Sequence, residues 1–323
     1  MTEIRGQWWD TLLEKTVFFS FTNLGYWLRR PLWKTRLRDY SLRGRVALVT
    51  GANSGVGRGA AEGLAKLGAR VYLLVRNRQK GEAAQAEIIR QTGHPDIHTV
   101  VCDLSRPGEV RAFGAEFRQQ ESRLDVLVNN AGILVHERQE TPEGLELTFA
   151  TNVLGGFVLT AELQPLLRAA GGARVIAVSS GGMYTAKVEI DDLQAATGPF
   201  DGVTAYASSK RAQVILTELW AEKTVSSGVA YQAMHPGWVY TPGVKRSLPG
   251  FTRIMRPFLR NIRQGADTIV WLSVAEAAGR ESGAFWFDRR RRATHRLENT
   301  RNTPTEYETL WRCCQELGGV EVR

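Results

Sequence analysis

Cysteines, long apolar runs and metal-ligand spacings are scarce in this sequence of 323 residues. The three cysteines, Cys102 and the adjacent pair Cys313 and Cys314, form neither a disulfide framework nor a metal-binding pattern. We therefore expect no metal site and a reducing, cytoplasmic environment. Positive charge is plentiful, with 42 Lys and Arg against 33 Asp and Glu. Because no helix-turn-helix, zinc-finger or RNA-binding signature accompanies it, nucleic acid is not an expected partner.

The first 44 residues differ from the rest because aromatic and basic side chains are concentrated there. Their most apolar run, 16–28, is 13 residues long and includes Ser20, Thr22, Asn23 and Gly25. A membrane-spanning helix needs about 20 apolar residues, so no span is expected. No small-residue cleavage pattern follows, which argues against a secretory signal. Two interpretations stay open: peripheral contact with a membrane surface, or an extension packed on the protein. Both would hold if the packed segment also touched lipid.

From residue 45 onward, predicted strands and helices alternate along the chain. The expected strands are 45–50, 70–75, 97–101, 124–128, 174–178, 229–234 and 284–287, and the expected helices are 56–67, 81–91, 109–120, 142–167, 206–223 and 264–274. This alternation is typical of an α/β protein with a Rossmann-type, doubly wound parallel sheet of about seven strands and helices on both faces. We expect one such domain over 45–288, flanked by extensions at 1–44 and 289–323. The cluster Arg289–Arg292 is expected to be a solvated charged face.

A glycine-rich turn joins the first predicted strand to the first predicted helix. In Thr50-Gly-Ala-Asn-Ser-Gly-Val-Gly57, Gly51 permits a tight exit from the strand and Gly55 the close approach of a pyrophosphate. Gly57 allows the helix to pack on the sheet, and the helix N-terminus offers N–H groups and a positive dipole end. The turn therefore predicts a dinucleotide site. Its expected contacts are Gly51, Asn53, Ser54, Gly55, Val56 and Gly57.

The end of the second strand indicates which dinucleotide is bound. Sites of this kind that take NAD usually place an acidic residue there, as acceptor for the ribose 2′-hydroxyl. Here the strand ends in Arg76-Asn77-Arg78, and Arg58 follows the glycine turn. Guanidinium groups suit a 2′-phosphate, although Arg76 and Arg78 also fit solvated charges on a loop. We favour NADP(H) over NAD(H), with Arg76 as a cofactor contact.

A serine and a tyrosine–lysine pair form the second motif. Ser180 follows an apolar strand, and Tyr206 and Lys210 are spaced to share one face of a helix. An ammonium beside a phenol favours the phenolate and lowers the pKa of the tyrosine. The spacing alone is common on helix surfaces. Its place in a chain with a dinucleotide turn makes proton transfer the stronger interpretation.

With these two motifs together, the sequence resembles the short-chain dehydrogenase/reductase family over about residues 45–287. The resemblance implies an alcohol/carbonyl oxidoreductase with Ser180, Tyr206, Lys210 and Asn152 as catalytic residues. It also implies cofactor contacts at Asp103, Leu104, Asn130, Ala131, Gly132, Tyr206, Lys210, Pro236, Gly237, Val239 and Thr241. Phrases such as Val178-Ser-Ser-Gly-Gly-Met183 are similar to a retinol-dehydrogenase-like group of this family.

The resemblance further assigns roles to the four catalytic candidates. Tyr206 would be the general acid in reduction, Ser180 would hydrogen-bond the substrate oxygen, and Lys210 would lower the pKa of Tyr206 and contact the nicotinamide ribose. Asn152 would anchor a water that connects Lys210 to solvent. Relatives commonly form homodimers through the helices expected at 142–167 and 206–223. His235, a lone histidine at a strand end, is expected to be structural.

Two segments depart from the family pattern or suggest the substrate. The stretch 183–203 is an extra excursion between the serine and the tyrosine, and we expect it to loop out over the site. The loop 238–263 is apolar and aromatic with interleaved basic residues, which suits a lipophilic small-molecule substrate or a membrane-facing surface. Rival interpretations are a non-catalytic NADP-binding protein and a membrane-surface interaction protein.

Overall fold

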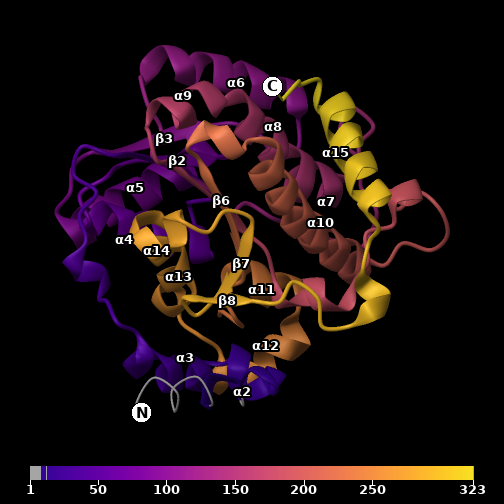
Figure 1. Ribbon diagram of the computed structural model, residues 1–323, viewed down its shortest axis with the longest axis horizontal. Helices are drawn as coiled ribbons and strands as arrows, with labels where there is room; N and C mark the ends of the chain where they lie inside the picture. The colour runs from indigo at the N-terminus through magenta and orange to yellow at the C-terminus, as the bar shows by residue number, and fades with distance from the viewer. Residues whose placement is uncertain (1–8, 12, 323) are drawn as a thin grey trace.

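The computed structural model describes residues 9–11 and 13–322, and its centre is an eight-stranded sheet (Figure 1). The strands are β1 (Val46–Thr50), β2 (Arg70–Val75), β3 (Ile97–Val101), β4 (Val126–Asn129), β5 (Arg174–Val178), β6 (Ala230–Met234), β7 (Ala284–Phe287) and β8 (Arg290–Arg292). They lie in the order β3-β2-β1-β4-β5-β6-β7-β8. All neighbouring pairs are parallel except β7 and β8. This is the predicted doubly wound sheet, with one antiparallel edge strand added.

Two layers of helices cover the sheet, and each encloses its own apolar core. One layer is α4 (Gly55–Lys66), α5 (Arg78–Thr92) and α13 (Ile262–Val274); the other is α6 (Pro107–Gln120), α8 (Gly155–Glu162), α10 (Gly202–Lys223) and α15 (Pro304–Gly318). The shorter helices are α2 (Val17–Phe21), α3 (Asn23–Arg29), α7 (Leu147–Phe149), α9 (Gln164–Ala169), α11 (Pro242–Ser247), α12 (Pro249–Met255) and α14 (Glu276–Gly279). Because both faces are covered, β1 and β6 are buried at every position.

The helix expected over 142–167 begins later and is broken. It starts at Leu147, because the Glu146 carboxylate accepts hydrogen bonds from the N–H groups of Thr148 (2.7 Å) and Phe149 (2.6 Å) and caps the first turn. The next residues, Ala150–Leu154, form a π-helical turn. Pro165 then opens α9 as a separate helix.

The N-terminal segment packs on the protein at the lower edge of Figure 1, where α2 and α3 lie beside α12. Arg29 is buried and donates to Asp288 Oδ2 at 2.9 Å, and Arg260 donates to Asp288 Oδ1 at 2.6 Å. Arg260 also donates to the carbonyls of Ser20 (3.0 Å) and Phe21 (3.1 Å). We call Arg29, Arg260 and Asp288 the buried clasp. These contacts correspond to the second interpretation of the N-terminal segment, an extension packed on the protein.

The expectation that Arg289–Arg292 form a solvated face is wrong for most of the cluster. Arg289 is buried and pairs with Asp267 at 2.6 Å, 22 residues away in sequence. Arg292 pairs with Asp10 at 2.7 Å, 282 residues away, and only Arg291 points mostly into solvent. A run of like charges does not reveal such distant partners. The same run forms β8 against β7.

The C-terminal helix α15 lies across α8 and α10. Trp311 meets Trp220 with 4.9 Å between ring centroids and Phe157 with 5.0 Å. It therefore covers helix faces through which a second copy was expected to pair. The excursion 183–203 is fixed partly by the same C-terminal region, since Asn302 exchanges two hydrogen bonds with the backbone of Val188. Within residues 9–11 and 13–322, no helix is both long and apolar enough to span a membrane.

Candidate active site

Strand β5 and helix α10 bring together Ser180, Tyr206 and Lys210. Ser180 lies two residues beyond the end of β5, and its Oγ accepts a hydrogen bond from the N–H of Gly182 at 3.2 Å. Tyr206 and Lys210 lie one turn apart on α10. Lys210 Nζ donates to the carbonyl of Val178, the last residue of β5, at 2.9 Å. The lysine is thereby tied to the strand that carries the serine.

Burial dominates the electrostatics of this group. Lys210 is 3% exposed, with Nζ 5.5 Å from the centroid of the Tyr206 ring. Loss of hydration lowers the pKa of Lys210 to about 7. Burial also raises the pKa of Tyr206, against a hydrogen bond with Ser180 that lowers it. The direction for Tyr206 is opposite to the sequence-based expectation, because desolvation outweighs the hydrogen bond with Ser180.

Asn152 lies in the π-helical turn and fastens the segment after β4. Its Oδ1 accepts from the N–H of Ile133 at 2.8 Å, and its Nδ2 donates to the Ile133 carbonyl at 3.0 Å and to Ser209 Oγ at 2.9 Å. Gly132 lies between these groups, and a Cβ there would be 3.1 Å from Lys210 Nζ. Asn152 therefore lies beside Lys210, with its side chain bonded to protein groups.

The glycine turn and the Asn-Asn-Ala-Gly segment meet at the carboxyl ends of β1 and β4. Thr50 Oγ1 accepts from the N–H groups of Asn130 and Ala131, each at 2.9 Å, and Asn130 Nδ2 donates to the Thr50 carbonyl at 2.8 Å. A side chain at Gly57 would collide with the Asn130 amide. Ser54 precedes α4 without a side-chain capping bond, so the first-turn N–H groups of α4 suit an anionic ligand.

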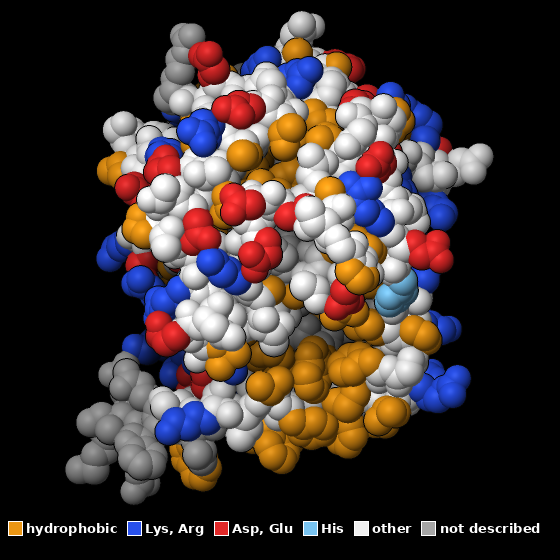
Figure 2. Space-filling model, turned by 90° about the vertical axis from the view of Figure 1, so that its right-hand side faces the viewer, with side chains coloured by type: hydrophobic (Ala, Val, Ile, Leu, Met, Phe, Trp, Pro, Cys, Tyr) orange, Lys and Arg blue, Asp and Glu red, His pale blue; other side chains and the backbone are white. Residues whose placement is uncertain are grey.

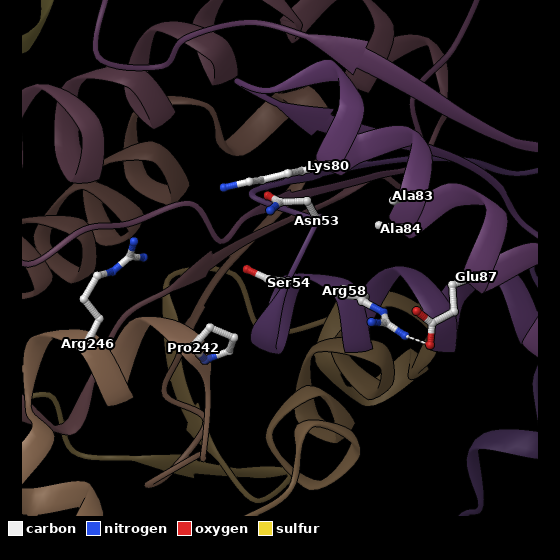
Figure 3. A pocket seen from close by; sticks show the side chains of 9 residues that line it. All are labelled: Asn53, Ser54, Arg58, Lys80, Ala83, Ala84, Glu87, Pro242 and Arg246. Atoms are coloured by element: carbon white, nitrogen blue, oxygen red, sulfur yellow. Dashed lines mark ion pairs between the residues drawn. The ribbon is translucent and has the colours of Figure 1, made fainter.

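A cavity of about 510 Å³ opens beside this turn (Figure 3). Its lining residues are Asn53, Ser54, Arg58, Lys80, Ala83, Ala84, Glu87, Pro242 and Arg246. Lys80 and Arg246 extend toward the open space from different elements, whereas Arg58 turns to Glu87 and pairs with it at 2.6 Å. Cationic walls next to a helix N-terminus fit the phosphates of a dinucleotide.

The cations that line this cavity differ from the predicted ones. Arg76 and Arg78 are exposed and do not line the cavity; Arg78 lies 3.8 Å from Glu82. Lys80 and Arg246 line it, and neither was predicted as a candidate cofactor contact. Lys80 is in the first turn of α5, just past the strand end where a phosphate-binding group was expected. Arg246 comes from the loop 238–263, and its sequence position does not predict that it lines this cavity.

The remaining predicted contacts surround the same edge of the sheet. Thr241 caps α11 and approaches Gly55, whose Cβ would lie 3.3 Å from the Thr241 methyl group. Asp103 accepts hydrogen bonds from Ser105, and the carbonyl of its neighbour Leu104 packs against Gly155. Pro236, Gly237 and Val239 follow β6, where Gly237 has a positive φ of 76°. These expected cofactor contacts therefore lie along the edge formed by the carboxyl ends of the parallel strands.

The loop after β6 is closed at its base by backbone hydrogen bonds. Tyr240 N–H donates to the Arg260 carbonyl at 2.9 Å, and Arg260 N–H donates to the Trp238 carbonyl at 2.7 Å. Helices α11 and α12 lie between these points. Trp238 packs edge-on against Phe251 with 5.3 Å between ring centroids. Phe21 connects this apolar wall to Gly181, the residue after Ser180.

Phe21, from the N-terminal segment, reaches the site and was not predicted. Its ring fills the space over Gly181, where a Cβ would collide with it, and Gly181 follows Ser180. It also meets Trp238 at 5.8 Å and His235 at 4.5 Å between ring centroids. Residues so far apart in sequence give no periodic signal that would have linked them.

Comparison with known proteins places these motifs in a described family. The family described as short chain dehydrogenase matches residues 45–250. Dehydrogenase/reductase SDR family member 12 from Bos taurus is 46% identical over 281 residues, which cover 86% of this chain and 88% of that protein. Retinol dehydrogenase 12 from Homo sapiens is 36% identical over 284 residues, covering 87% and 89%.

Solved structures give the same picture of the fold. An uncharacterized protein from Mycobacterium paratuberculosis matches with a TM-score of 0.71 and 26% identity, covering 90% of this chain and 99% of that one. The 3-ketoacyl-(acyl-carrier-protein) reductase from Brucella melitensis, complexed with NADH, matches at 0.61 and 26% identity, covering 76% and 96%. Pseudomonas aeruginosa RhlG in a complex with NADP is similar in fold, at 0.63 and 24% identity, covering 76% and 94%.

Proposed function

Because this chain belongs to the short-chain dehydrogenase/reductase family, we propose that Tyr206 is the general acid–base of its reaction. The family makes the protein an alcohol/carbonyl oxidoreductase that uses a nicotinamide cofactor and a small-molecule substrate. The observation that carries the proposal is the meeting of Ser180, Tyr206 and Lys210 where β5 and α10 join. This arrangement also argues against the rival interpretation of a non-catalytic NADP-binding protein.

In the reducing direction, Tyr206 donates its phenolic proton to the carbonyl oxygen of the substrate, and Ser180 donates a hydrogen bond to the same oxygen. The cofactor supplies the hydride when bound. Lys210, when protonated, stabilises the phenolate that remains. Asn152 holds the Gly132–Ile133 backbone beside the lysine, so it supports the site rather than exchanging a proton itself.

Replacing Tyr206 by Phe tests this assignment. We expect Tyr206→Phe to lower NADPH-dependent carbonyl turnover by about 10³-fold, because the proton donor is lost while the ring remains. Cofactor binding, measured by fluorescence titration, should stay close to wild type. Tyr184→Phe is the matched control, since this buried tyrosine donates to the Ala293 carbonyl away from Lys210. Undiminished turnover in Tyr206→Phe would remove Tyr206 from the mechanism.

We propose NADP(H) as the preferred cofactor because of the cationic cavity walls. Lys80 and Arg246 line the cavity without an opposing carboxylate at the end of β2, while Arg58 is partly neutralised by Glu87. We expect kcat/KM to be at least about tenfold higher with NADPH than with NADH, since a 2′-phosphate gains charge-assisted hydrogen bonds. Lys80→Gln should reduce that preference, and Lys66→Gln, on an exposed part of α4, should not. A higher kcat/KM with NADH in wild type would contradict the proposal.

A lipophilic substrate is the third part of the proposal. The wall beside Ser180 is built from Phe21, Trp238 and Phe251, which offer apolar surface and few hydrogen-bonding groups. We expect kcat/KM to rise along a series of straight-chain aldehydes as methylenes are added. Preference for short polar carbonyls would contradict this part while leaving the assignment of Tyr206 intact.

We also propose that the protein binds the surface of an anionic membrane through one face. Figure 2 shows hydrophobic side chains gathered along its lower edge, the region where α2 and α12 lie in Figure 1. The exposed large apolar residues of this region are Val17, Phe18, Phe19, Leu24, Trp27, Leu28, Leu32, Ile254 and Phe258. Phe18 and Phe258 meet at 5.2 Å between ring centroids, so the two segments form one surface. We call it the apolar face; such patches mark interaction sites.

The charges around the apolar face select an anionic partner. No Asp or Glu occurs between Glu14 and Asp39 or between Glu222 and Asp267. Lys15, Arg30, Arg253 and Arg256 are exposed in these two stretches. Aromatic side chains entering the headgroup boundary, with cations at the phosphates, are typical of proteins that lie on a membrane. A second copy of the chain fits this face less well, because its own apolar face carries the same positive charge and would repel the first.

Sedimentation of the full chain with vesicles tests the membrane proposal. We expect wild type to bind vesicles that contain phosphatidylserine and to bind pure phosphatidylcholine vesicles at least about tenfold more weakly, because basic groups add to apolar insertion. Trp27→Glu and Ile254→Glu should both abolish binding. Val225→Glu, at an 82% exposed position far from the face in sequence, is the control. Equal sedimentation of wild type and both variants would refute the proposal, as would self-association through the face without vesicle binding.

A further inference from the structure

Gln213 connects Lys210 to the backbone of Asn152. It lies on α10 three residues beyond Lys210 and is 7% exposed. Its Oε1 accepts a hydrogen bond from Lys210 Nζ at 3.1 Å, and its Nε2 donates to the Asn152 carbonyl at 2.7 Å. Because the nitrogen end faces a carbonyl, the oxygen end must face the lysine. The amide orientation is therefore fixed.

The lysine has two acceptors and both are uncharged. Besides Gln213, its amine donates to the Val178 carbonyl at 2.9 Å. Among the described residues, the titratable side chain beside the Lys210 amine is Tyr206, whose ring centroid lies 5.5 Å from Nζ. Burial, and no acidic side chain, shifts the pKa of Lys210. An acceptor stabilises the ammonium more than the neutral amine. Loss of one of two acceptors should therefore change how readily Lys210 gives up its proton.

The Gln213 amide bonds to Asn152, the residue at which the family resemblance implied a bound water. That water was expected to link Lys210 to solvent at Asn152, but here the Asn152 carbonyl bonds to Gln213 and its side chain bonds to Ile133 and Ser209. A carboxamide accepts and donates hydrogen bonds without passing protons as water does. A cavity of about 40 Å³ has Asn152, Gln213 and Thr217 in its lining. This volume holds about one water, and the Gln213 side chain lies between it and the lysine amine that it accepts from.

We propose that Gln213 is a positioning residue that favours the protonated form of Lys210 and holds its amine beside Tyr206, and that its amide occupies the Asn152 carbonyl in place of a water. The inference rests on the proposed roles of Tyr206 and Lys210. It predicts that an uncharged side chain without an acceptor at position 213 and a carboxylate there change the protonation of Lys210 in opposite directions.

The test compares Gln213→Met, which keeps the volume without an acceptor, with Gln213→Glu, which adds a carboxylate. The pKa of Lys210 is read by NMR from lysine labelled with ¹³C at Cε, with Lys210→Met identifying the resonance. We expect this pKa to fall by about one pH unit in Gln213→Met and to rise by at least as much in Gln213→Glu. Thr217→Val, which lines the same cavity without touching the lysine, should leave it unchanged.

Kinetic profiles provide the second readout. In Gln213→Met, kcat should fall about tenfold at pH 7.5 and much less at pH 6, whereas in Gln213→Glu the same limb of the profile should move to higher pH. Opposite shifts of the Lys210 pKa in protein without measurable turnover would support the role of Gln213 and count against the proposed reaction. Normal turnover with no pKa shift in either variant would overturn the role of Gln213 alone. Melting temperatures of all variants confirm that each is folded.

Discussion

At the scale of single residues, loss of hydration controls the charge of the groups around Ser180. Burial lowers the pKa of Lys210, raises that of Tyr206 and lowers that of His235 well below its ordinary value. All three changes favour the uncharged form. These buried groups therefore hold a charge less readily than the same groups in water. A phenolate formed there would gain more from a nearby ammonium than it would in water.

His235 makes a prediction about stability possible. It is 1% exposed, stacks on Phe287 with 3.9 Å between ring centroids, and its Nε2 has no hydrogen-bond partner among the described residues. Below about pH 6.5, His235 binds a proton in the unfolded chain but stays neutral in the folded protein. The free energy of unfolding should therefore fall as the pH is lowered from 7.5 to 5. The slope from this one group approaches about 1.4 kcal/mol per pH unit.

Urea denaturation at several pH values measures that slope. His235→Phe should show a shallower slope than wild type, even though it is less stable at pH 7.5 because the N–H of Gly237 loses its acceptor. Part of the slope should remain, since burial also lowers the pKa of His295, to about 4. His136→Gln, at an exposed position, is the control. A slope in His235→Phe as steep as that of wild type would show that His235 is not responsible.

At the scale of elements, the buried clasp joins α2 and α3 to the end of the loop 238–263 and to the turn between β7 and β8. Asp288 lies between the guanidinium groups of Arg29 and Arg260, and these hold its pKa low despite complete burial. Arg260 is also the residue that closes the base of the substrate loop. One carboxylate therefore fixes both α2–α3 and the loop. Phe21 is held over Gly181 as a result.

Removing one member of the clasp should release the N-terminal helices. Arg29→Met leaves the buried Asp10 and Asp288 with fewer partners, so the free energy of unfolding should fall by about 3 kcal/mol. Chymotrypsin should then cut between residues 18 and 27 faster than in wild type. Arg30→Met, the exposed neighbour, should change neither result. Wild-type cleavage rates in Arg29→Met would mean that other contacts hold the segment.

The sequence predicted those elements whose signals are local. The bounds expected for β2, β5 and β7 agree with the structure, because buried parallel strands leave short apolar runs. The bounds of β3 agree as well, although this edge strand is only partly buried. The delayed start at Leu147 depends on the Glu146 cap, which a helical pattern does not reveal. Of the candidate site, the family motifs selected Ser180, Tyr206 and Lys210, which the structure brings together where β5 and α10 join. They did not identify Phe21, Lys80 or Gln213, because the role of each depends on contacts with residues that are distant in sequence.

At the scale of the whole molecule, the C-terminal helix changes which surfaces are open. α15 buries Leu310, Trp311 and Cys314 against α8 and α10. The faces through which copies were expected to pair are thereby covered within one chain. The apolar face, which includes Ile254 and Phe258 of the loop 238–263, contains most of the exposed large apolar side chains among the described residues.

We expect the protein to be a monomer at micromolar concentration when no lipid is present, because α15 occupies the pairing helices. Size-exclusion chromatography with light scattering measures this. Trp311→Glu should uncover the apolar sides of α8 and α10 and give association or a lower melting temperature. Leu317→Glu, at a 38% exposed position of the same helix, should behave like wild type. A stable wild-type dimer that survives Trp311→Glu would show pairing through another surface.

The buried clasp also sets an order of events during synthesis. Arg29 and Asp288 are 259 positions apart, so a ribosome must add all of the residues between them before they can pair. Strands β1 to β6 have by then been synthesised, whereas the clasp is incomplete. The aromatic segment of α2 and α3 is therefore synthesised long before the last partner that holds it. That segment is available to chaperones or to a membrane surface earlier than to its own fold.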